Sequence, residues 1–210
     1  MGLTTFFDPR RLLGRSAVFQ ACQKCLSRHD SGDRLAREFL KIAPGQRVLD
    51  VGCGTASILA HLPPSVDYHG YDLSADYIAE AGRRYGERGS FNRAAVSLDA
   101  VAGLGKFDVV ISIGVLHHLD DEEAAVVFAS AAEILRPGGR VVTCDGAYVR
   151  PQNPIARLLL ALDRGKYVRT PDAYLSLARP YFPDAQARIV CDLLAVPYTH
   201  CIIEAWKPAT

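Results

Sequence analysis

The sequence has no excess of charge of either sign. Its 210 residues contain 24 lysines and arginines and 23 aspartates and glutamates, so the formal net charge is only +1. A protein that attracts nucleic acid or an anionic membrane through its overall field is strongly charged, and this one is not. Basic residues are also interspersed with acidic ones, without the stripe that is typical of a nucleic-acid surface. We therefore expect no nucleic-acid partner.

The sequence also lacks a long apolar run. None approaches the roughly 18 to 20 residues of a membrane span. Near the N-terminus, Asp8, Arg10 and Arg11 interrupt the apolar core that a signal peptide needs. We therefore expect a cytoplasmic protein without stable membrane insertion.

Cysteines are scattered, which argues against a disulfide framework. The chain has six of them, and it is long enough to bury a core without disulfide bonds. Cys22 and Cys25 stand at the spacing of metal ligands, with His29 nearby, but no second pair follows at the distance of a zinc site. We expect the cysteines to be reduced and mostly buried, and we expect no metal.

From residue 47 the sequence contains a regular alternation of short β-branched runs and amphipathic segments. Strands that alternate with helices form a parallel sheet covered on both faces, so the pattern predicts the α/β class. Two strand-like runs within 185–207, joined around Pro197, predict a closing antiparallel pair. The expected strands are 47–51, 66–72, 93–98, 107–113 and 139–145, and the expected helices are 56–62, 74–88, 120–135, 155–165 and 170–182.

Composition favours a single domain, 1–210, because 49% of the residues are hydrophobic and two full domains would be cramped in this length. The first 45 residues are expected to form a helical extension. Residues 146–184 interrupt the alternation and are expected to form an insertion, resembling a lid, over a site. Its apolar "LLLAL" segment would also suit a helix lying on a membrane, but we favour a lid packed on the sheet.

A glycine-rich loop follows the first expected strand, in "RVLDVGCGTA". In open parallel sheets, ligands bind beyond the carboxyl ends of the strands. Gly52 and Gly54 allow the backbone to approach a ligand closely, and Thr55 can begin a helix whose amides point at it. The alternative is a tight turn without a ligand.

Acidic residues end three successive expected strands: Asp50, Asp72 and Asp99. A carboxylate on the loop would repel the pyrophosphate of NAD, and the loop lacks the third glycine of the hydride-transfer fingerprint, so an NAD-dependent oxidoreductase is disfavoured. A cationic ligand suits Asp50 better. Asp72 is placed to accept both hydroxyls of a ribose, and Asp99 to accept from the amine of an adenine.

Five motifs between Gly45 and Asp145 occur in one order: "VLDVGCGTA", "YHGYDLS", "VSLDA", "FDVVISIGVLHHLDD" and "ILRPGGRVVTCDG". In these motifs the sequence resembles the class I S-adenosylmethionine-dependent methyltransferases, and its flanks resemble bacterial members of a methyltransferase-11-like subgroup. The resemblance implies a Rossmann-like, seven-stranded sheet that is mostly parallel, with its last strand antiparallel. It also implies methyl transfer to a small-molecule or metabolite acceptor.

The resemblance further implies which residues hold S-adenosylmethionine. The glycine loop would lie against the methionyl part, Asp72 would hold the ribose hydroxyls, and Asp99 would meet the amine edge of the adenine. Ala56 stands where the family usually has a third glycine of the loop. The expected cofactor-binding residues are Asp50, Gly52, Gly54, Thr55, Asp72, Leu73, Asp99, Ala100, Ile113 and Gly114.

Candidate catalytic residues follow the fourth and fifth expected strands. A sulfonium methyl group is already activated, so the protein must chiefly align a nucleophile with it, and a general base is optional. His117 is the candidate base, and Asp145 a candidate substrate contact. The alternative for the "LHHLDD" segment is a histidine that only packs at a helix start. A non-catalytic subunit that keeps the fold, and with it the cofactor site, is a further alternative.

Overall fold

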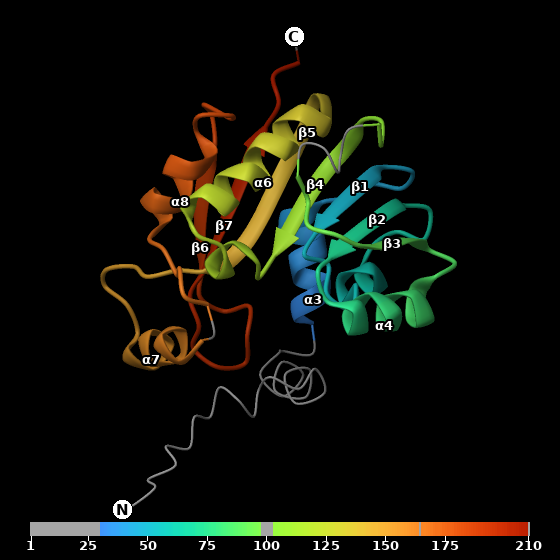
Figure 1. The fold of residues 1–210 in the computed structure, drawn as a ribbon. Coiled ribbons are helices and arrows are strands. Elements are labelled where there is room, and N and C mark those ends of the chain that lie inside the picture. The colour runs from blue at the N-terminus through green and yellow to red at the C-terminus, as the bar shows by residue number, and fades with distance from the viewer. Residues whose placement is uncertain (1–29, 98–102, 164, 210) are drawn as a thin grey trace, which may run out of the picture.

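The computed structural model describes residues 30–97, 103–163 and 165–209 of the chain (Figure 1). Within these ranges, seven strands form one sheet in the order β3-β2-β1-β4-β5-β7-β6. Neighbouring strands run parallel, except that β7 is antiparallel to both β5 and β6. The expected Rossmann-like α/β sheet is therefore confirmed. The strands are β1 (Arg47–Val51), β2 (Asp67–Asp72), β3 (Gly89–Arg93), β4 (Phe107–Ile113), β5 (Leu135–Gly146), β6 (Gln186–Val190) and β7 (His200–Trp206).

Helices of three types connect the strands. The π-helix η1 continues directly from α3, and η2 and η3 are short 3₁₀ helices. The longer helices begin at residues with capping side chains: Ser74 precedes α4, Asp120 forms a capping box with Glu123 at α6, and Thr170 precedes α8. The described helices are α3 (Ser31–Arg34), η1 (Leu35–Leu40), η2 (Ser57–His61), α4 (Ala75–Tyr85), η3 (Leu116–His118), α6 (Asp121–Ile134), α7 (Pro154–Leu162) and α8 (Pro171–Ala178).

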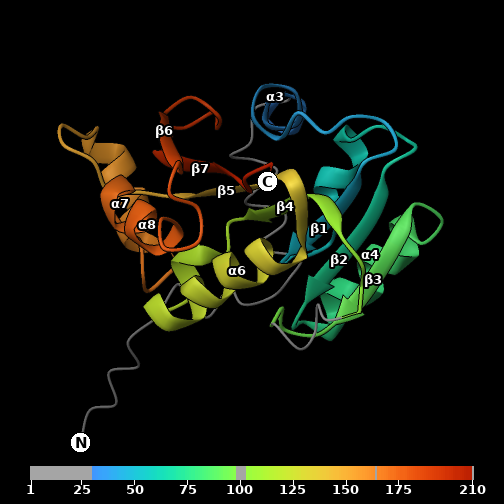
Figure 2. The same ribbon diagram turned by 90° about the horizontal axis from the view of Figure 1, so that it is seen from above.

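The sheet separates two hydrophobic layers, because successive side chains of a strand point to opposite faces. Val110 of β4 packs in the layer that contains residues of α6 and α8. Its neighbours Val109 and Ile111 pack in the layer that contains residues of η1, η2 and α4. Figure 2 shows α6 and α8 on one side of the sheet and α3 on the other. The carboxyl ends of the parallel strands meet at one edge, the lower edge in Figure 1.

Three expected elements need correction. The third strand lies at Gly89–Arg93 and not at 93–98, since the chain uses the polar "GSFNR" segment as the edge strand beside β2. The helix expected at 56–62 is the 3₁₀ helix η2. The helix expected at 170–182 ends at Ala178.

The segment expected to form a lid, 146–184, divides into two parts. Tyr174 and Leu175 of α8 are buried in the same layer as α6, so this helix belongs to the core of the domain. By contrast, α7 lies at the carboxyl edge of the sheet (Figure 1), and Ile155 and Leu158 are exposed there. A covering role is therefore a prediction only for the part that contains α7.

The N-terminal extension is described only from residue 30, where α3 and η1 are helical as expected; Cys22 and Cys25 lie outside the described residues. The four described cysteines are free thiols. Cys144 and Cys201 are buried, but Cys191 is exposed. No helix in the described ranges is both long and apolar enough to cross a membrane.

Candidate functional site

The glycine loop turns sharply beyond β1 and rests on the end of β2. The backbone amides of Gly52 and Cys53 donate to the carbonyl oxygen of Tyr71 at 2.7 and 3.0 Å. The amide of Gly54 donates to Oδ2 of Asp72 at 2.9 Å. Two successive strand ends are thus tied together at the edge where ligands bind in such sheets.

The two glycines of the loop have different surroundings. Both have positive φ angles, +73° at Gly52 and +55° at Gly54, in the left-handed region that favours glycine. A Cβ atom on Gly52 would collide with Val115, whereas one on Gly54 would meet no atom within 4 Å. Gly52 is therefore required by packing, and Gly54 presents bare backbone to open space, as a ligand-binding loop requires.

Ala56 also adopts a left-handed conformation, with φ +54°, although it carries a side chain. It is fully buried at the start of η2. An L-residue in this region costs about 1–2 kcal/mol relative to a right-handed one. The fold therefore keeps the backbone conformation that suits a third glycine and accommodates the methyl group at this cost.

Asp50 lies beneath the loop and is only 2% exposed. Its Oδ2 accepts a short hydrogen bond of 2.5 Å from the hydroxyl of Tyr68, and its Oδ1 has no partner among the described residues. Burial raises the pKa of Asp50 to about 7; the hydrogen bond from Tyr68 opposes this rise, and the charge of Asp72 adds to it. A buried carboxylate with an unpartnered oxygen is suited to a cationic group placed above it.

The second strand end supplies a carboxylate and an apolar surface. Oδ1 of Asp72 accepts from the amide of Ser74 at 2.8 Å, and the residue stays partly exposed. Leu73 beside it is 68% exposed, as expected of a residue that lies against a flat apolar ligand. Asp99 and Ala100, expected at the third strand end, lie outside the described residues.

The fourth strand end completes this part of the site. Ile113 ends β4 half-buried, and Gly114 follows it, exposed and with φ +72°. The amide of Gly114 donates to the carbonyl of Cys144 in β5 at 2.8 Å. Eight of the ten expected cofactor-binding residues thus lie at or just beyond the ends of β1, β2 and β4, with Thr55 in the glycine loop.

His117 and Asp145 form a buried pair next to Gly114. Nδ1 of His117 lies 2.9 Å from Oδ1 of Asp145, and the same oxygen accepts from the backbone amide of His117 at 3.3 Å. The two residues are 6% and 2% exposed. A Cβ on Gly114 would lie 3.8 Å from Cε1 of His117, so the imidazole edge borders the expected cofactor site.

Asp163 approaches the other side of the same imidazole. Its Oδ1 lies 3.6 Å from Nε2 of His117 and accepts from the amide of Gly165 at 3.0 Å. Its Oδ2 accepts from the hydroxyl of Tyr198 at 2.9 Å. His117, Asp145 and Asp163 are called the histidine–carboxylate cluster below. Sequence reasoning missed Asp163 and Tyr198, because no motif or spacing connects them with His117 before the chain folds.

The carboxylates around His117 raise its pKa. Burial lowers the pKa of His117, but the hydrogen bond and charge of Asp145 and the charge of Asp163 outweigh this effect, so its pKa lies above the ordinary value. His200, which precedes Cys201 in β7, is affected in the opposite way: burial lowers its pKa to about 4. The pKa values of the two histidines are therefore shifted in opposite directions.

Arg169 supports the segment that carries the two histidines. Its guanidinium, 8% exposed, donates to the carbonyls of Leu116, Leu119 and Tyr167 at 2.7, 2.8 and 3.0 Å. It also contacts Oδ1 of Asp121 through two nitrogens at 2.9 and 2.7 Å. Arg169 thus fixes η3 to the start of α6 and to the chain that follows α7, and sequence reasoning did not find it.

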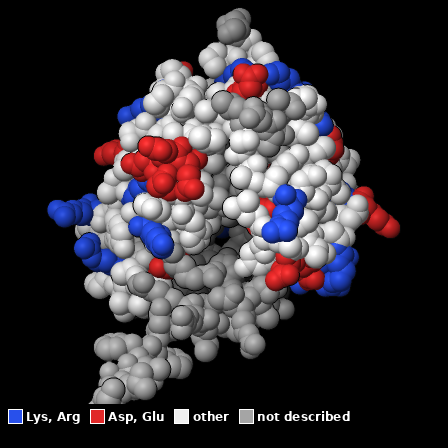
Figure 3. Space-filling model, viewed as in Figure 1, with Lys and Arg blue, Asp and Glu red and all other residues white. Residues whose placement is uncertain are grey.

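The surface is hollowed near this edge of the sheet. Figure 3, viewed as Figure 1, shows the hollow close to the carboxyl end of β4. At the end of this strand, Gly52 of the glycine loop lies against Val115, and the imidazole of His117 borders Gly114. The arrangement provides a loop for one ligand and titratable side chains for a second.

Comparisons with known proteins agree with this geometry. The chain matches a family model described as a methyltransferase domain (Methyltransf_12) over residues 49–141. The uncharacterized protein syc1184_c of Synechococcus sp. is 42% identical over 133 residues, which are 58% of this chain and 31% of that protein. The O-methyltransferase cnsE of Penicillium expansum is 35% identical over 123 residues, 54% of this chain and 44% of that protein. The chain thus spans less than half the length of these two relatives.

The fold is also similar to solved structures. The crystal structure of human N-acetylserotonin methyltransferase in complex with S-adenosylmethionine matches with a TM-score of 0.66 and 19% identity. The match covers 91% of this chain and 54% of that chain. At this identity the likeness concerns the fold alone.

Proposed function

Because the chain belongs to the class I S-adenosylmethionine-dependent methyltransferase family, we propose that it transfers a methyl group from this cofactor to a small-molecule acceptor. The observation that carries the proposal is the junction of two sites at the end of β4. A loop with bare backbone at Gly54 is tied to Asp72, and a buried His117–Asp145 pair lies beside Gly114. One site suits the cofactor and the other suits the acceptor.

The residues of the glycine loop fit the cofactor. Asp72 offers a carboxylate for ribose hydroxyls, and exposed Leu73 offers an apolar surface for the adenine. The unpartnered Oδ1 of Asp50 suits the positive charge that S-adenosylmethionine carries. When bound, the cofactor supplies a methyl group on a positively charged sulfur. Asp99 and Ala100 are proposed for the adenine amine from the sequence alone.

On the acceptor side, the chain aligns the nucleophile and holds a proton. Transfer proceeds by in-line displacement, so holding the acceptor in line with the methyl group supplies much of the rate enhancement. Asp145 fixes the orientation of the His117 ring through Nδ1, which leaves Nε2 toward Asp163. An acceptor that loses a proton can transfer it to this cluster, where the imidazole and two carboxylates share the charge.

The alternatives are disfavoured by particular features. An NAD-dependent oxidoreductase needs a loop that receives pyrophosphate, and the buried carboxylate of Asp50 under this loop would repel it. A non-catalytic subunit would keep the loop but would not need a buried His117–Asp145 pair beside it. Cofactor preference and turnover distinguish these alternatives from the proposal.

The proposal is tested by incubating the protein with S-adenosylmethionine and a panel of small hydroxyl and amine compounds, and by measuring S-adenosylhomocysteine. We expect compound-dependent formation of S-adenosylhomocysteine. With an acceptor in hand, His117→Ala should lower kcat far more than it lowers cofactor affinity. If kcat and cofactor affinity fell equally, the acceptor-side role of His117 would be wrong.

A further inference from the structure

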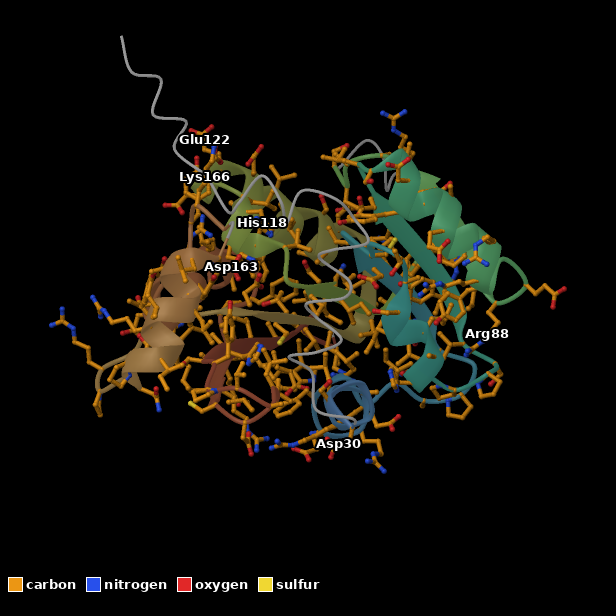
Figure 4. All side chains as sticks on the ribbon, turned by 90° about the horizontal axis from the view of Figure 1, so that it is seen from below. Asp30, Arg88, His118, Glu122, Asp163 and Lys166 are labelled. Carbon is orange, nitrogen blue, oxygen red and sulfur yellow. The ribbon has the colours of Figure 1, made fainter. Side chains whose placement is uncertain are left out.

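Three side chains with metal-binding atoms converge beside α7. His117, His118 and Asp163 each offer one ligand atom, and these atoms all lie within 4.8 Å of one another. Figure 4, which looks onto the carboxyl edge of the sheet, shows the labelled His118 and Asp163 close together at the acceptor side. His117 is buried, Asp163 is partly buried and His118 is exposed, so the group opens to the surface on the His118 side.

The distance between Nε2 of His117 and Oδ1 of Asp163 is informative. At 3.6 Å it is longer than a hydrogen bond. Ligand bonds of about 2.0–2.2 Å in a tetrahedral zinc site place ligand atoms about 3.3–3.6 Å apart. His117 and Asp163 therefore already stand at the separation of two metal ligands, and a ligand atom of His118 lies within 4.8 Å of both.

Hydrogen-bond partners outside the group hold His117 and Asp163 in the orientation that a metal ion needs. Asp145 accepts from Nδ1 of His117, which directs the lone pair of Nε2 away from it and toward Asp163. Protein histidines that bind metals almost always have such a carboxylate or carbonyl on their second nitrogen. Asp163 is fixed in turn by the amide of Gly165 and the hydroxyl of Tyr198.

Charge also favours a cation at this position. Asp145 and Asp163 flank a single imidazole, and Oδ2 of Asp145 has no hydrogen-bond partner among the described residues. Arg169, the buried cation close to this group, contacts Asp121 and three carbonyl oxygens. The negative charge of these two carboxylates therefore favours a bound cation beside the imidazole.

We propose that His117, His118 and Asp163 bind a divalent transition-metal ion of the zinc type at the acceptor side of the site. Two imidazole nitrogens and one carboxylate oxygen suit zinc, cobalt or nickel and do not suit magnesium, which prefers oxygen ligands. Three protein ligands leave a position open for an oxygen atom of the acceptor. This inference rests on the proposed function, and it departs from the expectation of no metal drawn from the sequence.

The ion would define the acceptor class as a compound with a hydroxyl group that can coordinate a metal. Coordination would lower the pKa of the hydroxyl, and its proton would leave to water. The oxygen would then bond to the methyl carbon while the bond from that carbon to the sulfur of S-adenosylmethionine breaks, which releases S-adenosylhomocysteine. In this form of the site His117 is a ligand and the ion, not the imidazole, activates the acceptor. The catalytic effect of His117→Ala is expected in either form, so metal binding itself has to be measured.

The test is titration of the full-length protein, stripped of metal with a chelator, with Co²⁺ followed by visible absorption and with Zn²⁺ followed by calorimetry. We expect one ion per chain and an absorption spectrum of nitrogen and oxygen ligands. His118→Ala should weaken binding at least about tenfold, and Asp163→Asn similarly. Since His118 is exposed, His118→Ala also serves if Asp163→Asn fails to fold.

Two controls make the result specific. His61→Ala removes a surface histidine that pairs with Asp33 at 2.8 Å on another part of the chain, and it should leave binding unchanged. The double variant Cys22→Ser with Cys25→Ser should also leave binding unchanged, since these thiols stand at metal spacing.

The proposal is overturned if the wild-type protein binds no ion or if His118→Ala binds as tightly as the wild type. It is also overturned if the Co²⁺ spectrum of the wild type has a thiolate band that is absent from the Cys22→Ser, Cys25→Ser double variant. Titration of the metal-free protein with S-adenosylhomocysteine tests the proposed function separately. If the protein bound S-adenosylhomocysteine but no metal ion, only the proposed metal site would be wrong. If it bound a metal ion but no S-adenosylhomocysteine, only the proposed function would be wrong.

Discussion

The backbone amide of Gly54 donates a hydrogen bond to Oδ2 of Asp72 over 2.9 Å, although the two residues are 18 positions apart in the sequence. This bond ties the glycine loop to the end of β2. The other oxygen of Asp72 accepts from Ser74 at 2.8 Å. Two backbone amides therefore fix the carboxylate, which keeps lone pairs for the ribose hydroxyls that we propose it binds.

Asp72→Asn should weaken cofactor binding, since the amide keeps one acceptor oxygen and turns a donor toward the Gly54 or Ser74 amide. Hydrogen bonds to a charged acceptor contribute about 1–3 kcal/mol, so the Kd for S-adenosylhomocysteine should rise about 5- to 150-fold. Calorimetry measures this change, and Asp76→Asn, an exposed acid in the first turn of α4, is the matched control. An unchanged Kd in a folded Asp72→Asn protein would place the ribose elsewhere.

Gly52→Ala and Gly54→Ala should separate packing from binding. Both substitutions place a side chain at a positive φ angle, which costs about 1–2 kcal/mol. Gly52→Ala adds a collision with Val115, so it should lower stability by a further amount of about 1–3 kcal/mol. Gly54→Ala should be the more stable of the two in urea denaturation, yet bind S-adenosylhomocysteine at least about tenfold more weakly than the wild type. Equal stability of both variants would contradict this difference.

Asp50 should make stability depend on pH. Its pKa is about 7 in the folded protein, mainly because it is buried, against an ordinary value of 3.8. Between these two values the folded state holds a proton that the unfolded state releases, so stability is lost as the pH rises through this window. Asp50→Asn removes the effect, and its stability relative to the wild type should rise by a few kcal/mol between pH 4 and pH 7.

Urea denaturation of both proteins at several pH values measures this difference, with Asp76→Asn as the exposed control. The wild type and Asp50→Asn would have parallel curves if the carboxyl group kept its ordinary pKa in the fold.

Arg169→Ala should destabilise the protein by about 2–4 kcal/mol, because it leaves the carbonyls of Leu116, Leu119 and Tyr167 without their donor. Asp121→Asn is the matched variant on the other side of the ion pair. Because the side chain of Asp121 is 80% exposed, this substitution should lower the free energy of unfolding by less than about 1 kcal/mol. Chemical denaturation of both variants compares them, and equal losses would mean that Arg169 acts mainly through the ion pair.

Much of the sheet could be predicted from the sequence, because its central strands are apolar and the helices begin at capping residues. The run at 107–113 became β4, and the Asp120 cap began α6. The third strand was predicted too late in the sequence. β3 is an edge strand with the polar sequence "GSFNR", much of which faces solvent, and the prediction followed the more apolar residues after it. A strand that pairs on one side only needs no apolar run.

The sequence could place the residues proposed for the cofactor at strand ends, because they lie in continuous motifs. The acceptor side could not, since Asp163 and Tyr198 reach His117 only through tertiary folding. The same is true of Arg169, whose guanidinium contacts Asp121 and the carbonyls of Leu116 and Leu119, about 50 positions away in the sequence. The sequence alone indicated His117 and Asp145 as candidate residues, but not the hydrogen bond between them.

The central claim is tested most directly by parallel calorimetric titration of the purified protein with S-adenosylmethionine, S-adenosylhomocysteine and NAD. The account predicts micromolar binding of both adenosyl ligands, one per chain, and no binding of NAD. Binding of NAD in place of the adenosyl ligands, or binding of none of the three, would contradict the assignment of the glycine loop to the cofactor.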